Sequence, residues 1–196
     1  MAGEIVPSPE ATLTIAVDAG LDRLLEQGLS PDIVVGDFDS VGGQGRAYLE
    51  AVDPCPEAYR VEAEKDFSDL DMALRVCAEK GIGAVTLSGF VGGRIDHQLA
   101  VFGVCARYAP QLSIALEDGQ LMVTFLAAGQ SCAVSQGRTF SVFALEDDAR
   151  VSIVGAQYPL TEHRLTPLSD YGLSNYAAEE SVVSVLHGVV AVIVPS

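Results

Sequence analysis

Short apolar runs alternate with helix-like segments up to about Pro110, and this alternation constrains the fold more than any other feature of the sequence. The run at 13–17 is followed by LDRLLEQG, where leucines recur at helical spacing and a glycine ends the pattern. Similar runs stand at 32–35 and 84–87, and the latter leads into an apolar helical segment at 98–108. Strands that alternate with helices usually form a mostly parallel sheet, so this part is predicted to be an α/β layer.

A further helix is predicted to begin after Ser68. The apolar residues of the segment DLDMALRVCAEKG fall on one stripe of a helix, and serine is a preferred N-cap residue. Between this helix and the run at 32–35, the pattern predicts a helix that ends near Val52 and a short strand at 59–61.

After about Pro110 the pattern changes to short β-rich runs separated by Gly, Asp and Ser turns. Two final runs, at 181–186 and 189–194, are separated only by His187 and Gly188 and are predicted to form a hairpin. The predicted fold is therefore α/β with two domains, a Rossmann-like, mostly parallel sheet domain followed by an antiparallel β-sandwich. The predicted domains are residues 1–116 and 117–196.

Charge and composition narrow the possible partners. The chain has 27 acidic and 11 basic residues, a formal net charge of −16, which disfavours binding to nucleic acid or to an anionic membrane. Its four cysteines form no metal-binding or redox motif and are expected to be core residues in a reducing compartment. No stretch of about 18 apolar residues occurs, so we expect a cytoplasmic protein that does not enter a membrane.

Acidic residues follow the predicted strands. Asp18, Asp37 with Asp39, Asp69 and Asp96 each stand just after a strand or at the start of the next helix. In an open α/β sheet the carboxyl ends of the strands form the ligand crevice, so these side chains are expected to converge at one edge. Each aspartate alone can be a turn former or a helix cap. Together they indicate a divalent cation, because clustered carboxylates repel one another without one, and Mg²⁺ prefers oxygen ligands.

The segment Gly36-Asp37-Phe38-Asp39-Ser40 gives the most detailed prediction. In an extended segment, the i, i+2 spacing would point both carboxylates the same way and turn Phe38 into the core. Gly36 would allow a close backbone approach, and Ser40 would cap the next helix.

The segment Gly92-Gly93-Arg94 would supply positive charge. Its glycines allow close backbone approach, and the Arg94 guanidinium can hold phosphate oxygens at two points, with Asp96 just beyond it. In isolation, such a segment can equally be a surface turn. Lys65 can contact phosphate, contact an acceptor molecule, or only neutralise neighbouring carboxylates.

Several segments of the sequence resemble the motifs of a known enzyme family. The segments VDAGLDRLLEQGLSPDIVVGDFDS, EKDFSDLDMAL and SGFVGGRIDHQLA resemble successive motifs of the thiamine pyrophosphokinase (thiamine diphosphokinase) family. The tail VGAQYPL…GLSN…SVVSVLHGVVAVIV resembles that family's C-terminal thiamine-binding β-domain. The resemblance implies a magnesium-dependent homodimer with its active site where the subunits meet. It also implies the reaction, in which ATP and thiamine give AMP and thiamine diphosphate.

The resemblance also implies roles for individual residues. Asp37, Asp39 and Asp69 would hold Mg²⁺ and the ATP phosphates, with Asp18 and Asp96 nearby and Arg94 on the phosphates. Lys65 and Ser68 would lie beside the acceptor or the triphosphate, and Ser174 with Asn175 would belong to the thiamine pocket. From their local sequence, Gly36, Ser40 and Gly93 are also expected to line the cofactor site. Our hypothesis for the base that accepts the hydroxyl proton is Asp69 or Asp96.

Two departures from the family pattern concern the contact with ATP and the identity of the acceptor, respectively. Ala19 stands where the family usually has glycine, and the segment around Ser174 and Asn175 is tyrosine-rich, with Tyr171 and Tyr176 as potential stacking faces. The alternatives are therefore a related diphosphokinase that acts on another heterocyclic alcohol, such as a pterin, and a nonenzymatic thiamine or nucleotide sensor.

Overall fold

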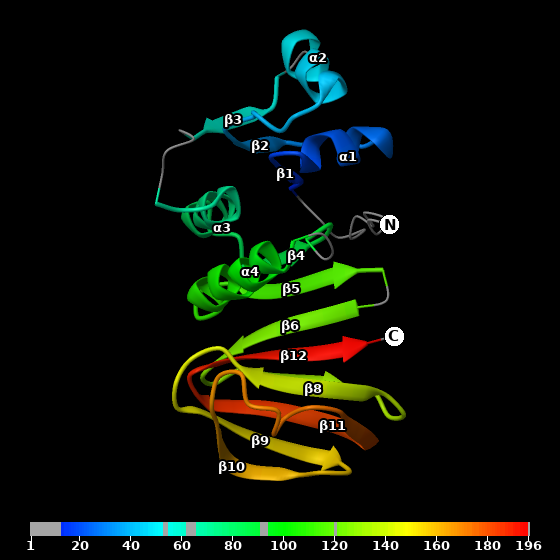
Figure 1. Ribbon diagram of the computed structural model, residues 1–196, viewed down its shortest axis with the longest axis vertical. Coiled ribbons are helices and arrows are strands. Elements are labelled where there is room, and N and C mark those ends of the chain that lie inside the picture. The colour runs from blue at the N-terminus through cyan, green and yellow to red at the C-terminus, as the bar shows by residue number, and fades with distance from the viewer. Residues whose placement is uncertain (1–12, 53–54, 62–65, 91–93, 120, 196) are drawn as a thin grey trace. The chain divides into compact units, whose positions relative to one another are not determined.

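The computed structural model describes residues 13–52, 55–61, 66–90, 94–119 and 121–195 (Figure 1). By its own contacts the chain divides into two compact units. The N-terminal unit ends at Gly81, and the C-terminal unit runs from Ile82 to the end of the chain. The predicted boundary after residue 116 concerns functional domains and stays a prediction.

The N-terminal unit contains a parallel three-stranded sheet in the order β1-β2-β3. The central strand β2 (Ile33–Gly36) is buried along its whole length and pairs with β1 (Ile15–Val17) and β3 (Glu57–Arg60). The described helices are α1 (Gly20–Glu26), α2 (Gly43–Ala51) and α3 (Asp69–Glu79). This arrangement confirms the predicted alternation of parallel strands and helices.

Alternate residues of β2 point to opposite faces of this sheet, as the strand period requires. Val34 packs with Leu21 and Leu24 of α1 on one face. Ile33 and Val35 pack on the other face with α3 residues, which include Ala73 and Val76. The sheet is therefore covered by helices on both faces, and its strand ends are held in a fixed register.

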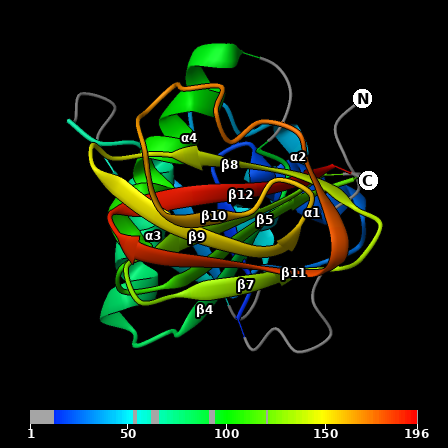
Figure 2. The ribbon, with the colours of Figure 1, turned by 90° about the horizontal axis from the view of Figure 1, so that it is seen from below.

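The C-terminal unit is built on a larger, mostly antiparallel sheet of nine strands, with the order β10-β9-β11-β8-β12-β6-β5-β4 and with β7 paired to β11 (Figure 2). Only β4 and β5 pair in parallel among its described strands. The elements are β4 (Ala84–Leu87), α4 (Ile95–Tyr108), β5 (Ser113–Asp118), β6 (Leu121–Ala127), β7 (Ser131–Val134), β8 (Thr139–Ala144), β9 (Ala149–Ala156), β10 (Leu160–Leu165), β11 (Asn175–His187) and β12 (Val189–Pro195).

The core of this unit joins strands from distant parts of the chain. Phe140 and Val142 of β8 and Val192 of β12 pack with Ile153 of β9 and Val183 of β11. On the other side of the sheet, α4 contacts β6 through an edge-to-face pair, Phe102 and Phe125, whose ring centroids are 5.4 Å apart. No helix in the described part of the chain is long and apolar enough to span a bilayer.

Two predictions about pairing are wrong. The runs at 181–186 and 189–194 do not form a hairpin, because β11 pairs with β7, β8 and β9 whereas β12 lies between β6 and β8. Gly188, at a φ of +72°, lets the chain cross from one group of strands to the other instead of folding back. In addition, β4 pairs with β5 and does not join the first sheet among the described residues.

The prediction that all four cysteines are core residues is partly wrong. All four are free thiols; Cys77 and Cys105 are buried, but Cys55 is exposed. Burial raises the pKa of the Cys105 thiol to about 12 and that of Cys132 to about 11, so these two sulfurs stay protonated at neutral pH.

Candidate functional site

The carboxyl ends of β1 and β2 bring three aspartates together. Asp18 directly follows β1, and its amide donates a 2.8 Å hydrogen bond to the carbonyl of Val35 in β2. Asp37 and Asp39 lie just beyond the end of β2. Carboxylate oxygens of the three residues lie within 4.8 Å of one another. We call these three residues the carboxylate cluster, and they confirm the predicted convergence for the first two loops.

Gly36 makes this close approach possible. Its φ of +152° disfavours any other residue, and a β-carbon there would lie 3.3 Å from the Cα of Asp18. The predicted need for a small residue at this position is therefore confirmed.

The loop after Gly36 is not the extended segment that the sequence predicted. Phe38 has a φ of +61° and Asp18 a φ of +48°, both in the left-handed region that non-glycine residues rarely adopt. The amide of Asp39 donates to Oδ1 of Asp37 at 3.0 Å, so a turn brings the two carboxylates together. Phe38 still packs against the apolar cluster beside α1, as predicted.

Ser40 does not cap the following helix. Its hydroxyl donates to Oδ2 of Asp18, which ties the second loop to the first. The amides at the start of α2 are held instead by Asp22 of α1, whose carboxylate accepts from Gly42 at 2.6 Å and from Gly45 at 2.9 Å. The side chain that caps α2 therefore belongs to another helix, α1, and not to the residues just before α2.

The electrostatics of the carboxylate cluster favour a cation. Repulsion from the Asp37 carboxylate, with a hydrogen bond between the two side chains, raises the pKa of Asp39 above its ordinary value. The second carboxylate oxygen of Asp18, Oδ1, is buried and has no hydrogen-bond partner in the described part of the protein. Buried polar atoms are normally satisfied, so three carboxylates with one orphaned oxygen fit a hard divalent cation such as Mg²⁺.

The start of α3 holds two further predicted residues. Ser68 caps the helix as predicted, since its hydroxyl accepts a 3.2 Å hydrogen bond from the amide of Asp71. Asp69 lies in the first turn and is not a member of the carboxylate cluster. Sequence reasoning missed Asp71, which is buried and 3.3 Å from Arg75. The i, i+4 spacing of these opposite charges was the available signal.

In the C-terminal unit, Arg94 and Asp96 form a two-point ion pair at the start of α4. The guanidinium donates to both carboxylate oxygens, from Nη2 at 2.5 Å and from Nε at 3.1 Å. This partner holds the pKa of Asp96 down to about 2, which makes Asp96 a weak base. Whether these residues join the carboxylate cluster in one site stays a prediction. Lys65 and Gly93 lie outside the described residues.

The two residues predicted for an aromatic ligand pocket have structural contacts. The amide of Ser174 donates to the hydroxyl of Ser141 at 3.0 Å. Asn175 is buried, and its side chain donates to the carbonyl of Tyr158 and accepts from the amides of Tyr158 and Tyr176. Asn175 thereby fastens the β9–β10 connection to the start of β11, and its predicted ligand role is not tested by these contacts.

Tyr171 has a stacking partner of its own. Its ring lies parallel to that of His163, with centroids 4.4 Å apart. Ala19 has helical backbone angles, so its β-carbon causes no backbone strain at the position where glycine was expected.

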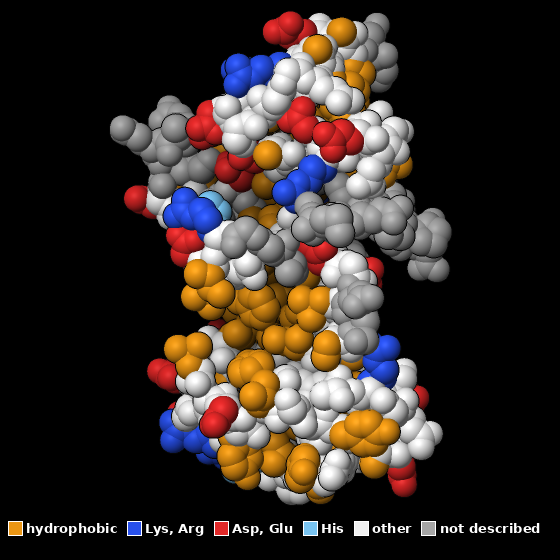
Figure 3. All heavy atoms as spheres, turned by 45° about the vertical axis from the view of Figure 1, so that its right-hand side comes forward, with side chains coloured by type: hydrophobic (Ala, Val, Ile, Leu, Met, Phe, Trp, Pro, Cys, Tyr) orange, Lys and Arg blue, Asp and Glu red, His pale blue; other side chains and the backbone are white. Residues whose placement is uncertain are grey.

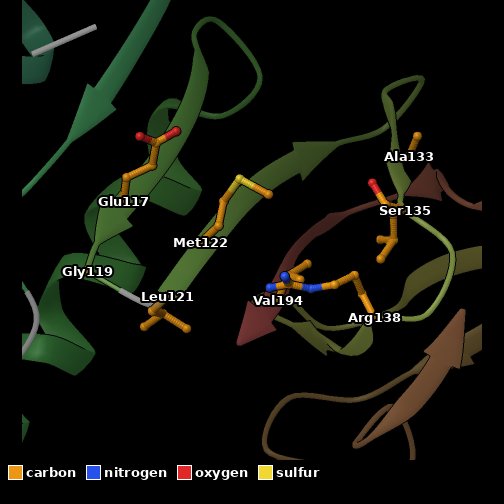
Figure 4. Close-up of a pocket in the computed structure, with 9 residues that line it drawn as sticks. Glu117, Gly119, Leu121, Met122, Ala133, Ser135, Arg138 and Val194 are labelled. Atoms are coloured by element: carbon orange, nitrogen blue, oxygen red, sulfur yellow. The ribbon is translucent and has the colours of Figure 1, made fainter. Parts of the chain in front are cut away.

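A cavity of about 370 Å³ lies elsewhere in the C-terminal unit (Figure 4). Glu117, Met122, Ser135 and Arg138 are among the residues that line it, and none of the predicted site residues does. The Arg138 guanidinium donates to the carbonyl of Pro195 at 2.7 Å, so this arginine already has a structural contact.

A parallel sheet whose strand ends carry clustered carboxylates is typical of α/β proteins that bind phosphate compounds through a metal ion. Residues 8–116 match the family model described as thiamin pyrophosphokinase, catalytic domain. The thiamine pyrophosphokinase of Bacillus subtilis (strain 168) is 33% identical over 174 residues, which are 85% of this chain and 78% of that protein. The chain belongs to the thiamine pyrophosphokinase family.

Solved structures agree with this assignment. The crystal structure of thiamine pyrophosphokinase from Bacillus subtilis superimposes with a TM-score of 0.83 and 29% identity, over 96% of this chain and 90% of that one. The thiamin pyrophosphokinase from Geobacillus thermodenitrificans superimposes with a TM-score of 0.80 and 26% identity, over 96% and 88%.

Proposed function

We propose that this protein is a thiamine diphosphokinase, which transfers a diphosphate group from ATP to the hydroxyl of thiamine and releases AMP. Family membership over most of the chain, together with the carboxylate cluster at the strand ends, is the observation that carries the proposal. A cytoplasmic location belongs to the same proposal, because the reaction consumes ATP.

In the proposed mechanism, Asp37 and Asp39 hold Mg²⁺. Asp18 is the third carboxylate within reach of them, and Asp69 at the start of α3 is a further candidate ligand. The bound ion would neutralise charge on the ATP phosphates, which is the main requirement of phosphoryl transfer besides positioning. The support for this assignment is the mutual repulsion of the carboxylates and the orphaned Oδ1 of Asp18.

Arg94 is proposed to contact the phosphates. A guanidinium matches phosphate as well as carboxylate oxygens, so Arg94 would exchange its two-point contact with Asp96 for one with the substrate. Release of Asp96 would raise its basicity. Either Asp96, after this exchange, or Asp69 would then accept the proton of the thiamine hydroxyl. Lys65, Ser68 and Gly93 complete the proposed phosphate and acceptor contacts.

Thiamine is proposed to bind near Ser174 and Asn175. Its thiazolium ring is a cation, and a strongly acidic protein attracts cations. Tyr171 and Tyr176 are partly exposed and offer aromatic faces in the same segment.

We also propose a homodimer with the active site between subunits. All the large apolar side chains that are exposed in the described part of the chain belong to the C-terminal unit; they include Ile95, Leu99, Tyr158, Leu168 and Leu173. Figure 3 shows apolar side chains gathered on one face of this unit. Such surfaces commonly mark interfaces. The proposed domains are a Rossmann-like catalytic domain, residues 1–116, and a thiamine-binding β-sandwich, residues 117–196.

The test is direct product analysis. The purified protein is incubated with ATP, Mg²⁺ and one alcohol at a time, with thiamine and a hydroxymethyl pterin as the two alcohols. Thiamine diphosphate and AMP in equal amounts are expected with thiamine alone. If AMP is released with the pterin but not with thiamine, the protein is a diphosphokinase that acts on a pterin. If thiamine binds but no AMP is released, the protein is a nonenzymatic sensor.

A further inference from the structure

Arg46, in the first turns of α2, turns back toward the loop that carries two of the clustered carboxylates. Its guanidinium donates from Nη2 to the carbonyl of Asp39 at 3.1 Å and from Nε to the carbonyl of Val41 at 2.9 Å. One rigid, planar group thus holds two carbonyls on either side of Ser40. The backbone that carries the Asp39 side chain is fixed from outside the loop.

The position of Arg46 in its helix is unfavourable for helix stability. The N-terminus of a helix carries partial positive charge, which favours acidic and disfavours basic side chains in the first turn. The first turn of α2 has no acidic residue of its own. The side-chain contacts that the structure shows for Arg46 go to the loop instead.

The start of α2 is a firm base for this contact. The carboxylate of Asp22 in α1 accepts hydrogen bonds from the amides of Gly42 and Gly45, so the beginning of α2 is tied to α1. Gly45 is buried, and a β-carbon there would lie 2.5 Å from Val41. The helix and the end of the loop are consequently packed without free space, and Arg46 extends from a fixed backbone.

The loop needs such support because its native conformation is costly. Phe38 occupies the left-handed region, and the Asp39 carboxylate faces two further carboxylates. Without an external restraint, both strain and repulsion would be relieved by moving Asp39 away. The Arg46 contacts oppose that movement, and the arginine stays charged at every accessible pH.

We propose that Arg46 is a positioning residue that keeps Asp39 in register with Asp37 and Asp18 for cation binding. In this role Arg46 acts through the carbonyls of Asp39 and Val41 and is not itself a ligand of the cation. This inference rests on the metal site of the proposed function.

The experiment measures metal binding directly, by calorimetric titration of the full-length, nucleotide-free protein with Mn²⁺. Arg46→Met removes charge and contacts, and Arg46→Lys keeps the charge but loses the two-point geometry. Arg150→Met, an exposed arginine on β9, is the matched control. We expect the Mn²⁺ dissociation constant to rise about tenfold in Arg46→Met, the lower range for residues that support metal ligands, and to rise in Arg46→Lys as well. The control should bind as the wild type does.

Other outcomes separate the failure of this inference from that of the proposed function. If the wild type binds Mn²⁺ and forms product but both Arg46 variants bind Mn²⁺ within twofold of it, the positioning role is wrong and the function stands. A lower melting temperature with unchanged Mn²⁺ affinity would overturn the role too. If Arg46→Met does not fold, the test is the Mn²⁺ dissociation constant of Arg46→Lys compared with that of the wild type. If the wild type itself binds no Mn²⁺, the metal site and this inference both fail.

Discussion

Two groups of aspartates in this protein have opposite surroundings. In the N-terminal unit, Asp18, Asp37 and Asp39 face one another, and the pKa of Asp39 is raised by its neighbour. In the C-terminal unit, Asp96 accepts two hydrogen bonds from the Arg94 guanidinium, which lowers the pKa of Asp96 to about 2. In the first group a neighbouring carboxylate is the main cause of the pKa shift, and in the second group a guanidinium is.

The difference indicates how each group meets a ligand. Carboxylates that repel one another gain most from an added cation, so the cluster is suited to a metal ion. A paired carboxylate gains little from one, and its partner must be displaced before either residue can act. The cluster is therefore expected to respond to metal alone, and the Arg94–Asp96 pair to respond to phosphate.

Asp37→Asn is expected to have the largest effect. It removes one of the clustered charges that would hold Mg²⁺ while keeping nearly the same shape, so kcat/KM for diphosphate transfer should fall by about 10²–10³-fold. Asp147→Asn, in an exposed turn of the C-terminal unit, is the control and should keep wild-type turnover. The measurement is product formation, followed by chromatography. Undiminished product in Asp37→Asn would show that the cluster does not hold the catalytic cation.

Arg94→Met tests the other group. Without its partner, Asp96 should titrate near the ordinary aspartate value of about 3.9 instead of about 2, which carbon NMR of the side-chain carboxyl can follow. The stability that this lowered pKa contributes is present above the unfolded-state value and is lost as the pH falls toward 2, so Arg94→Met should flatten acid unfolding in that window. Turnover should fall about tenfold to 100-fold.

The same NMR signal tests the proposed exchange of partners. In the wild type, adding Mg²⁺ and a nonhydrolysable ATP analogue should raise the Asp96 pKa, because the guanidinium moves to the phosphates. An unchanged titration at saturating nucleotide would leave the Arg94–Asp96 pair as a structural feature only.

Gly36→Ala is expected to damage the cluster through the backbone. A β-carbon at a φ of +152° and 3.3 Å from Asp18 should cost about 1–3 kcal/mol of stability, measured by urea unfolding, and should weaken Mn²⁺ binding. Gly43→Ala is the matched control, since a β-carbon there has no neighbour within 4 Å. It should be neutral or slightly stabilising. Equal stabilities in the two variants would show that the close approach at Gly36 is unimportant.

These two regions also show what the sequence could and could not predict. Strand and helix positions, the Ser68 cap and the meeting of Asp18 with Asp37 follow from local periodicity and from the rule that parallel strands end at one edge. The left-handed Phe38 was missed, because an i, i+2 pattern is equally compatible with an extended chain.

Contacts between distant residues account for the remaining misses. The Asp22 cap of α2, the Ser40 contact with Asp18 and the Arg46 contacts depend on how α1, β2 and α2 pack. The separation of β11 from β12 has the same origin, because two consecutive apolar strands joined by a glycine resemble a hairpin until their partners are known. Local patterns predict elements, whereas pairing depends on the whole core.

The smallest expected effect is on the stability of the metal-free protein in Asp39→Asn, and its sign distinguishes the two groups of aspartates. A carboxyl whose folded-state pKa is raised stabilises the fold below its unfolded-state pKa and loses that contribution as the pH rises through the folded-state value. At pH 7 the ionised Asp39 therefore opposes folding, so the asparagine variant should melt slightly higher than the metal-free wild type. The difference should vanish near pH 3, where carboxyls of this kind are largely protonated.

Saturating Mn²⁺ should reverse the order of the two melting temperatures, because only the wild type keeps all three carboxylates. A lower melting temperature of the variant in metal-free buffer at pH 7 would mean that Asp39 is already compensated, and the contrast with Asp96 would then be lost.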